Sequence, residues 1–376
     1  MKIIVTISRL LLIIVLLSLT SLASLAVWGC GDNTQGSRNT VDAAFDNLSQ
    51  AESYRLDMDL ALEMNGDLSK VAPEAAAVLP LALDFRAVID ADLSDLKDLR
   101  MRIHDIRLDG LDKMLRDLAS TSGGTEAQGA MMAGMVNQML EGTEVVFIGT
   151  TYYFNFAGSW YELPLDNLAR DAQQKSGDVV DMDCLMDKYQ NLYSADNLMS
   201  AYMENPSVLV DLRKVGSADI DGVSTGHFQA AVDGQKMTDM MNTAMQDYMD
   251  AMRECGMPQD TGVDDMDQEM QDFMDAMQSA FDASTVELWI DEDDNIRRYR
   301  MDMNLDMGEL ARTIGDDSDA RDLETMTLKI TTTLKYSAFG EDMGIEAPSD
   351  TLPFEDLLNL FGGNSLDDLK VSQVNA

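Results

Sequence analysis

Histidine and cysteine are scarce in this chain of 376 residues, which limits the chemistry that its side chains can perform. The only two histidines, His104 and His227, each lie in a segment where polar and apolar residues alternate, as in a β-strand with one solvated face. Neither is accompanied by the strand–turn–helix elbow that presents a nucleophilic serine. We therefore interpret both as strand histidines on a solvated face, and the sequence predicts that the protein is not an enzyme.

Methionine is abundant, with 29 residues, and its thioether is a potential ligand of soft metals. Thioether clusters can bind Cu(I), so a methionine-rich copper-binding protein is one alternative. The methionines replace leucine at core-facing positions throughout the predicted strands and helices, however, and this favours packing over metal binding. The acidic turn at 291–294 lacks the spaced oxygen ligands and the glycine of an EF-hand. We therefore expect no metal site and no cofactor.

The charge balance restricts the classes of partner. The chain has 27 Lys and Arg against 67 Asp and Glu, which gives a formal net charge of −40. Because a chain this acidic has no basic patch with which to neutralise phosphates, nucleic acid is excluded as a partner. Direct adsorption to anionic lipid head groups is disfavoured for the same reason.

The N-terminal segment predicts an extracytoplasmic lipoprotein. A short positive region with Lys2 and Arg9 precedes an apolar run at 10–27, as in a secretory signal. The sequence before Cys30 is similar to a bacterial lipobox, after which the cysteine is lipidated, for example with palmitate. We predict a signal peptide at 1–29, the lipidated cysteine and a tether at 30–39, and anchoring to the extracytoplasmic face of the cell membrane. The alternative is an uncleaved signal anchor.

The two remaining cysteines, Cys184 and Cys255, form an even pair in a compartment that would be oxidising, which favours a disulfide. It would close a loop of about seventy residues and stabilise the fold by about 4 kcal/mol in the chain-entropy model. Two free buried thiols are the alternative.

The segment 236–282 has a strong helical pattern and is expected to form a helical hairpin with a turn at Gly256 and Pro258. Its two apolar stripes consist mainly of Met237, Met240, Met241, Met245, Met249 and Met252, and then of Met266, Met270, Phe273, Met274 and Met277. Such stripes are either ordinary core or the wall of a cavity for a lipid-like ligand. Methionine suits the second use because its flexible thioether adapts to apolar partners of varied shape.

One-sided alternation recurs in about eleven segments, and no Pro-, Gly- or Ser-rich linker separates them. This predicts one domain at 40–376 of class α+β, in which a large curved antiparallel sheet forms a half-barrel and helices cover its concave face. A sheet of this size has more apolar surface than two helices can seal, which favours a space between the layers. The strand residues that we expect to line this space are Met58, Leu60, Leu62, Met301, Met303 and Leu305.

Several local signals make sharper predictions. The alternation slips in phase near Asp105, which predicts a bulge, and Asp221 and Gly222 predict a hairpin turn. The strand that begins near Tyr299 is expected to continue to Met307. Further helices are expected at 41–51, 126–141, 183–193, 195–204 and 354–361, and the methionines of the second, among them Met131, Met132 and Met135, lie on one side of it.

The lipobox-like site at Cys30 and five stretches of the chain carry a resemblance to a known family. The stretches are 43–64, 145–163 with Gly149, Tyr153, Trp160 and Tyr161, 215–233 with Gly222 and Asp233, 289–291, and 334–348. In these the chain resembles the mycobacterial LppX/LprG-type lipoproteins and, more distantly, the LolA/LolB lipoprotein carriers. The resemblance implies an eleven-stranded half-barrel whose concave side is covered by helices and holds acyl chains.

Together these features predict a membrane-anchored lipoprotein that binds or carries a lipid or acylated hydrophobic ligand in a cavity between sheet and helices. The main alternative is a non-enzymatic, acidic surface lipoprotein with a filled core, which acts through its outer surface. The sequence does not identify a protein partner.

Overall fold

The structure is a computed structural model of the chain. It describes residues 35–67, 79–95, 98–121, 125–164, 184, 188, 208–255, 277–314, 325–354 and 356–357. The predicted signal peptide and lipidated cysteine, the helix at 195–204 and most of those at 183–193 and 354–361 lie outside these residues.

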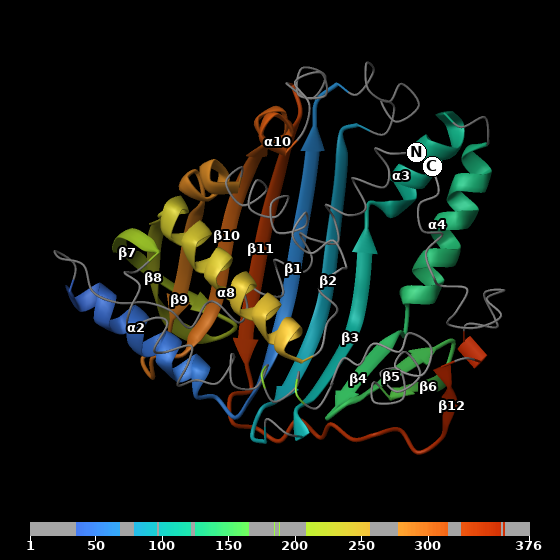
Figure 1. The fold of residues 1–376 in the computed structure, drawn as a ribbon, viewed down its shortest axis with the longest axis horizontal. Helices are drawn as coiled ribbons and strands as arrows, with labels where there is room; N and C mark the ends of the chain where they lie inside the picture. The colour runs from blue at the N-terminus through green and yellow to red at the C-terminus, as the bar shows by residue number, and fades with distance from the viewer. Residues whose placement is uncertain are drawn as a thin grey trace.

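Every described strand belongs to one twelve-stranded sheet in the order β12-β6-β5-β4-β3-β2-β1-β11-β10-β9-β8-β7 (Figure 1). The strands are β1 (Ser53–Asn65), β2 (Leu81–Asp92), β3 (Arg100–Asp109), β4 (Glu144–Ile148), β5 (Thr151–Phe156), β6 (Ser159–Pro164), β7 (Leu209–Ile220), β8 (Val223–Val232), β9 (Thr285–Ile290), β10 (Ile296–Asp306), β11 (Thr327–Ser337) and β12 (Thr351–Pro353). Neighbours are antiparallel except for β12, which runs parallel to β6. The structure confirms the predicted fold class, and the strand that the sequence did not predict is β12.

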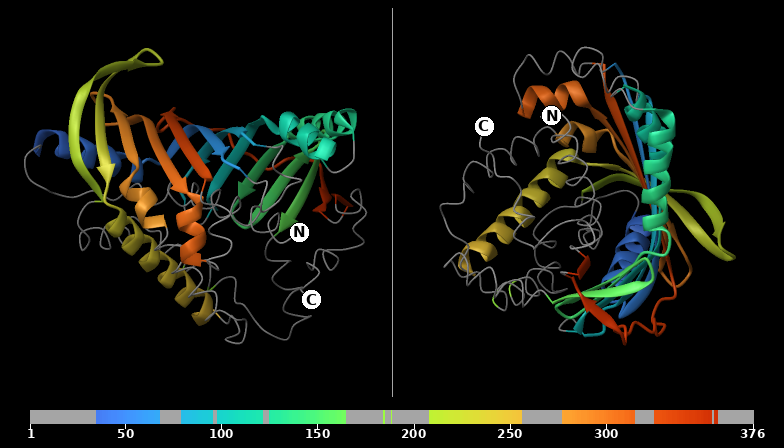
Figure 2. Two further views of the ribbon diagram at one scale, coloured as in Figure 1. Left: turned by 90° about the horizontal axis from the view of Figure 1, so that it is seen from above. Right: turned by 90° about the vertical axis from the view of Figure 1, so that its right-hand side faces the viewer.

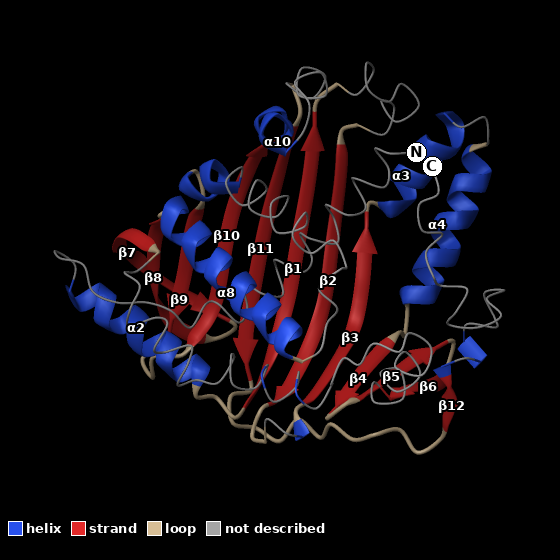
Figure 3. Ribbon diagram, viewed as in Figure 1, coloured by secondary structure: helices blue, strands red, loops and turns tan. Residues whose placement is uncertain are grey.

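The described helices are α2 (Gln35–Ser49), α3 (Leu111–Thr121), α4 (Glu126–Leu140), α8 (Gly234–Glu254) and α10 (Met307–Ile314) (Figure 3). Figure 2 shows the sheet bent into an open half-barrel, with α8 and α10 on the concave side. The hairpin of α3 and α4 connects β3 to β4 and lies near the opposite end of the sheet from α2, which contacts β7, β9 and β10.

The core lies on the concave face, where the alternating pattern of each strand places its apolar side chains. On the central strand β1, Leu56 and Leu60 are almost completely buried, and α2 adds Val41 and Phe45 to the same apolar cluster. Residues aligned across strands share this face. One such row consists of Met301, Thr332, Leu60 and Phe85.

Two local predictions are confirmed by the backbone. Asp105 has a positive φ of 52°, and the pairing of β2 with β3 shifts register opposite it, between Arg86 and Val88. The β7–β8 turn has positive φ at both Asp221 and Gly222, as a two-residue hairpin requires. The bulge turns the end of β3 and precedes the α3–α4 hairpin.

The prediction that β10 continues to Met307 was wrong. The strand ends at Asp306, whose carboxylate Oδ1 accepts hydrogen bonds from the backbone N–H groups of Gly308 (2.9 Å) and Glu309 (3.0 Å). A side chain that satisfies the free N–H groups of a first helical turn starts a helix, so α10 begins where the strand pattern appeared to continue. Helix α3 was also not predicted.

A segment that follows β11 crosses the outer face of the sheet before it reaches β12. Its backbone carbonyls accept hydrogen bonds from Ser53 Oγ at Glu341 (2.8 Å) and from Arg102 at Met343 (3.3 Å). Met343 and Ile345 form a second, smaller apolar cluster with Val146 of β4. This crossing explains why β12 reaches the far edge and pairs parallel to β6.

Candidate functional site

The predicted site residues of the strands all belong to the concave-face cluster, but they differ in burial. Met58, Leu60, Leu62 and Leu305 are buried, whereas Met301 and Met303 of β10 are only partly buried. The partly buried set also includes Phe85 of β2 and Ile103, Ile106 and Leu108 of β3. Large apolar side chains therefore point into the half-barrel at these positions without being fully covered.

The inward side chains of β8 and β9 form a contrasting, closed part of the same face. Phe228, Val286 and Leu288 keep 3% or less of their surface exposed. Met277, in the turn of helix that precedes β9, is buried with them. The concave face thus has a closed part at β8 and β9, and it has open positions at the inward residues of β3, at Phe85 of β2 and at Met301 and Met303 of β10. We call these open positions the open part.

Helix α8 lies on the concave side, and the methionines at its start pack against the apolar cluster of the sheet. Met237, Met240 and Met241 pack against the core while partly exposed, and Met249 is buried. The side chains of Met245 and Met252 lie outside the described parts of the chain, as do Met266, Met270, Phe273 and Met274. Of the predicted second helix, only its end is described.

The start of α8 is fixed by two carboxylates. Asp233 accepts a hydrogen bond from the backbone N–H of Lys236 at 3.2 Å, as an N-cap does. Gly234 donates its N–H to Asp282 Oδ1 at 2.7 Å. A Cβ at Gly234 would lie 2.3 Å from the carbonyl oxygen of Gln278, so the contact between α8 and the segment before β9 needs glycine there.

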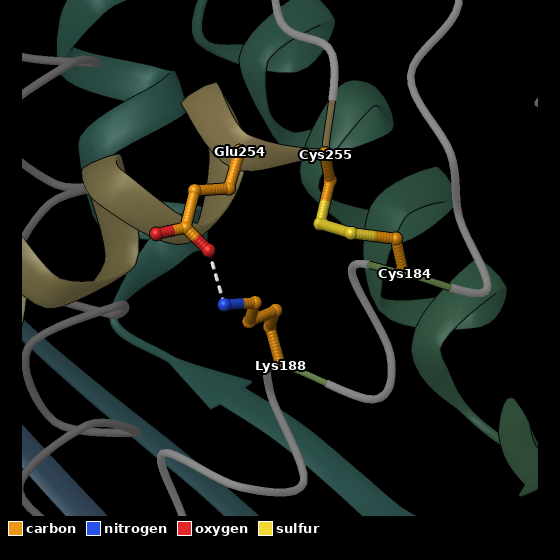
Figure 4. The surroundings of a disulfide bond; sticks show 4 residues. All are labelled: Cys184, Lys188, Glu254 and Cys255. Carbon is orange, nitrogen blue, oxygen red and sulfur yellow. Dashed lines mark hydrogen bonds and ion pairs between the residues drawn. A yellow bond between two sulfur atoms is a disulfide. The ribbon is translucent and has the colours of Figure 1, made fainter.

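The other end of α8 is fixed by a disulfide between Cys255 and Cys184, with the Cα atoms 5.5 Å apart (Figure 4). The pairing expected from the sequence is therefore present. Lys188 and Glu254 form an ion pair beside it. Both ends of the methionine-rich helix are thus tied to segments distant in sequence.

Three tyrosines, Tyr54, Tyr299 and Tyr336, add polar groups to the concave face, and they were not among the predicted site residues. The Tyr299 hydroxyl donates to Met301 Sδ at 3.4 Å, and the Tyr336 hydroxyl is buried without a hydrogen-bond partner. Burial raises the pKa of both phenols, and at Tyr336 the neighbouring Tyr54 and Tyr299 add to the effect. The strand alternation does place all three at inward positions, so the signal was available.

His104 lies on the outer, polar face of β3 as predicted, but the interpretation that it is solvated there was wrong. Its side chain is 25% exposed, and Nε2 lies 3.3 Å from Asp90 Oδ2 on the outer face. Asp90 is fully buried and accepts hydrogen bonds of 2.6 Å from both Arg55 and Arg102. Burial alone would raise the pKa of Asp90, but the two guanidinium groups outweigh it and hold that pKa below its usual value. This network lies beneath the crossing segment and away from the concave face.

His227 is also mostly covered, since its ring stacks on Trp289 with centroids 4.4 Å apart. The nearby sequence from Gly222 to Gly226 has the spacing Gly-x-Ser-x-Gly, but it forms the β7–β8 turn and the start of β8 rather than a nucleophile elbow. Ser224 and His227 lie on opposite faces of the strand because they are three residues apart. This arrangement does not form a catalytic pair.

The acidic turn after β9 is organised by its own first residue. Asp291 Oδ1 accepts hydrogen bonds from the backbone N–H groups of Asp293 (3.0 Å) and Asn295 (2.8 Å), and Oδ2 accepts one from Arg297 at 2.6 Å. These contacts occupy the carboxylate. Among the described residues, no group of three or more His, Cys, Asp or Glu side chains is arranged to hold a metal ion.

Helix α4 contradicts the expectation that the methionines face the core throughout. Met131, Met132 and Met135 do lie on one side of it, but they are 62%, 52% and 56% exposed. The buried side of α4 consists instead of small residues such as Gly129 and Ala133, which pack toward α3. Spacing alone does not distinguish the two sides.

In the part of the chain that the structure describes, no helix combines the length and the apolar composition needed to cross a membrane.

Neither a protein-family model nor a curated protein matches the chain. Solved structures that do match include lipoprotein LppX of Mycobacterium tuberculosis (9% identity, TM-score 0.33, covering 84% of this chain and 100% of that one). LprF of Mycobacterium bovis matches with 11% identity and a TM-score of 0.36, covering 85% and 100%. A DUF1329 family protein of Desulfovibrio piger has 8% identity and a TM-score of 0.21, covering 84% and 96%.

The first two matches are to the group of lipoproteins that the sequence resembles. At these identities and at TM-scores below 0.5, the matches carry no argument about function. The half-barrel is instead established by this chain's own strand order and register.

Proposed function

We propose that this protein is a non-enzymatic, extracytoplasmic lipoprotein that binds a lipid or acylated ligand between the concave face of the sheet and α8. The acyl chains would lie against the open part of that face. Cys30 would carry the lipid that anchors the protein. The sequence assigns the tether to residues 30–39, but α2 begins at Gln35, so the tether that we propose is shorter than predicted.

One observation carries this proposal: the large apolar side chains on the open part are only partly buried although they point toward the helices. Met301 and Met303 on β10 and Met237, Met240 and Met241 of α8 pack against the same cluster, and none of the five is fully covered. In a filled interior such side chains are packed at the density of an organic crystal. Partial exposure at inward positions supports a space that hydrocarbon can occupy.

The energetics favour an acyl ligand of loose specificity. Each methylene removed from water contributes about 0.8 kcal/mol, so a chain of moderate length binds well without any polar contact. Methionine walls re-pack around ligands of different shape, which lowers selectivity. Hydrophobic burial of the acyl chain does not depend on charge, so it also favours binding to an acidic protein.

The first experiment is to purify the membrane-anchored protein, extract it with organic solvent and identify co-purified lipid by mass spectrometry. Uptake of a fluorescent fatty acid by the delipidated protein is the second readout. We expect bound lipid and saturable uptake. Recovery of no lipid together with no uptake would contradict the proposal.

A matched pair of variants separates a hollow from a filled interior. Met303→Trp fills the open part, whereas Asn304→Trp places the same side chain at the neighbouring, exposed position on the outer face. If Met303→Trp displaces two methylenes of ligand, the affinity for fatty acid falls about tenfold. The melting temperature stays unchanged and Asn304→Trp binds normally.

A filled core, as in an acidic surface lipoprotein, gives the reverse pattern. Met303→Trp would then overpack the interior and destabilise the fold by about 1–3 kcal/mol. Fatty-acid binding would be absent in the parent protein and in both variants.

A further inference from the structure

Three phenols form a diagonal row across neighbouring strands of the concave face: Tyr54 on β1, Tyr336 on β11 and Tyr299 on β10. Tyr336 pairs with Leu56, which is the inward residue next to Tyr54 on β1. Tyr299 pairs with Leu334, which is the inward residue next to Tyr336 on β11. The rings of Tyr54 and Tyr336 meet edge to face, with centroids 5.7 Å apart. Tyr336 therefore lies between the other two tyrosines, on the middle strand of the three.

The hydroxyl of Tyr336 is a buried donor without an acceptor. Tyr336 is 3% exposed, and its hydroxyl has no hydrogen-bond partner among the described residues. The other described strand residues with an unpartnered buried atom project from the outer face, and they are His104, Asn155, His227 and Arg298. Phenylalanine would fill the position of Tyr336 without burying a polar atom. Tyrosine there lowers stability unless a further group accepts its hydrogen bond.

The hydroxyl of Tyr299 has a weak acceptor. It donates to Met301 Sδ at 3.4 Å, and a thioether sulfur accepts hydrogen bonds poorly. Met301 belongs to the open part, and its unbranched side chain can move aside for a ligand. A ligand that enters the open part at Met301 therefore comes first to the Tyr299 end of the row.

The three tyrosines act as neutral donors. Burial raises the pKa of each of these phenols, so all three stay protonated at neutral pH. A protonated phenol offers its O–H to an oxygen acceptor but carries no positive charge. A carboxylate would lose its hydration here without gaining a counter-ion from the phenols, and the net charge of −40 adds to that cost. The acceptor that suits the row is therefore uncharged.

We propose that the ligand is an acyl ester whose carbonyl oxygen accepts a hydrogen bond from the Tyr336 hydroxyl, with Tyr299 as a second donor. This inference rests on the proposed function and adds a polar contact to the acyl binding described there. An ester places a neutral acceptor directly beside a hydrocarbon chain, which matches a few hydroxyls within a mainly apolar face. A free fatty acid binds through its chain alone and keeps its carboxylate in solvent.

The test compares methyl palmitate with octadecane, a hydrocarbon of similar length that has no acceptor. Each competes with a fluorescent fatty acid for the delipidated protein. We expect Tyr336→Phe to lower the affinity for methyl palmitate about tenfold and to leave that for octadecane unchanged. In the ligand-free protein, the same variant should raise the melting temperature by about 2–4 °C, because no hydroxyl is left unpaired.

Two further variants make the result specific. Tyr153→Phe is the matched control, since it removes a hydroxyl from the outer face, where Tyr153 packs beside Val146. It should change neither affinity. Tyr299→Phe should weaken methyl palmitate by about threefold, a smaller loss, because its hydroxyl gives up the contact with Met301 to bind the ester.

The infrared band of an isotope-labelled ester carbonyl gives a readout that needs no variant. A hydrogen bond weakens the C=O bond, so the band of methyl palmitate bound to the parent protein should lie at lower wavenumber than in octadecane solution. It should return to the solution value in Tyr336→Phe. A bound band at the solution value in the parent protein would overturn the proposal, even if Tyr336→Phe did not fold.

The competition results separate this inference from the proposed function. If neither methyl palmitate nor octadecane binds, the proposed function fails and this inference fails with it. If both bind and Tyr336→Phe changes neither affinity, only this inference fails, and a lower melting temperature of that variant would assign the hydroxyl to a buried water. An equal loss of both ligands would assign Tyr336 to packing and would also overturn the proposal.

Discussion

Helices α4 and α8 are both rich in methionine at helical spacing, yet they use it in opposite ways. On α8, Met249 is buried and Met237 packs against the sheet, whereas Met131 and Met132 on α4 are more than half exposed. The two apolar stripes look alike in the sequence. An apolar stripe in the sequence therefore identifies the apolar face of a helix, but it does not show whether that face packs against the sheet or remains exposed.

The difference in methionine burial follows from where each helix lies relative to the sheet. Helix α8 follows β8 and crosses the concave face, where the inward side chains of many strands are available (Figure 2). Helix α4 belongs to the connection between β3 and β4 and is already packed against α3 through Gly129 and Ala133. Small residues allow that close approach, so the bulky methionines are left on the other side.

Removing the disulfide at the end of α8 is expected to give the largest change in stability, and it tests whether α8 is held in place more firmly than α4. Replacing both Cys184 and Cys255 with alanine opens a loop closed over 71 residues, and the chain-entropy model gives a loss of about 4 kcal/mol in the free energy of unfolding. Urea denaturation measures this loss. Hydrogen exchange should quicken in the last turn of α8 and stay unchanged in α4; equal loosening of both helices would contradict our account.

A matched truncation sharpens the comparison with a smaller effect. Met249→Ala on α8 leaves a cavity in the core and should lower the free energy of unfolding by about 3 kcal/mol. Met132→Ala on α4 removes a solvated side chain and should change it by less than about 0.5 kcal/mol. Chemical denaturation of the two variants measures both values, and equal losses would show that α4 is packed in solution.

Much of this fold follows from period-two patterns. Eleven strands could be predicted because inward and outward residues alternate, as in the segment of β1 around Leu60, and the bulge at Asp105 is visible as a slip of phase. Strand β12 could not be predicted, because three residues show no period. It depends on a segment whose Met343 and Ile345 pack on the outer face, a contact made far along the chain.

The candidate site was only partly predictable for the same reason. Alternation places Met301 and Met303 on the concave face, but their incomplete burial depends on how closely α8 approaches. Asp90 is buried by Arg55 and Arg102 only once three strands and the crossing segment are in place. The sequence around His104 therefore could not predict this network. Burial is a property of the assembled layers.

Helix α2 contains no methionine and packs on the closed part of the sheet. A change of pH at its Asp42 is expected to give the smallest effect on stability of the three predictions. Asp42 lies between the buried Val41 and Ala44, and its Oδ1 has no hydrogen-bond partner. Burial raises the pKa of Asp42 to about 6, Arg38 opposes this, and Asp46 adds to it.

The raised pKa determines the sign of the pH dependence. Between about pH 4 and 6 the folded state binds the proton more tightly than the unfolded state, so stability falls as the pH rises through this window. Asp42→Asn removes the ionisation and should stabilise the protein at pH 8 by about 1 kcal/mol or less, because solvent screens a half-exposed carboxylate. At pH 3.5 the Asp42 carboxyl is protonated in the folded state and mostly protonated in the unfolded state, so the difference should nearly vanish. Melting curves of the two proteins at pH 8 and 3.5 measure it; a gain at pH 3.5 equal to that at pH 8 would mean that shape, and not charge, limits how α2 packs.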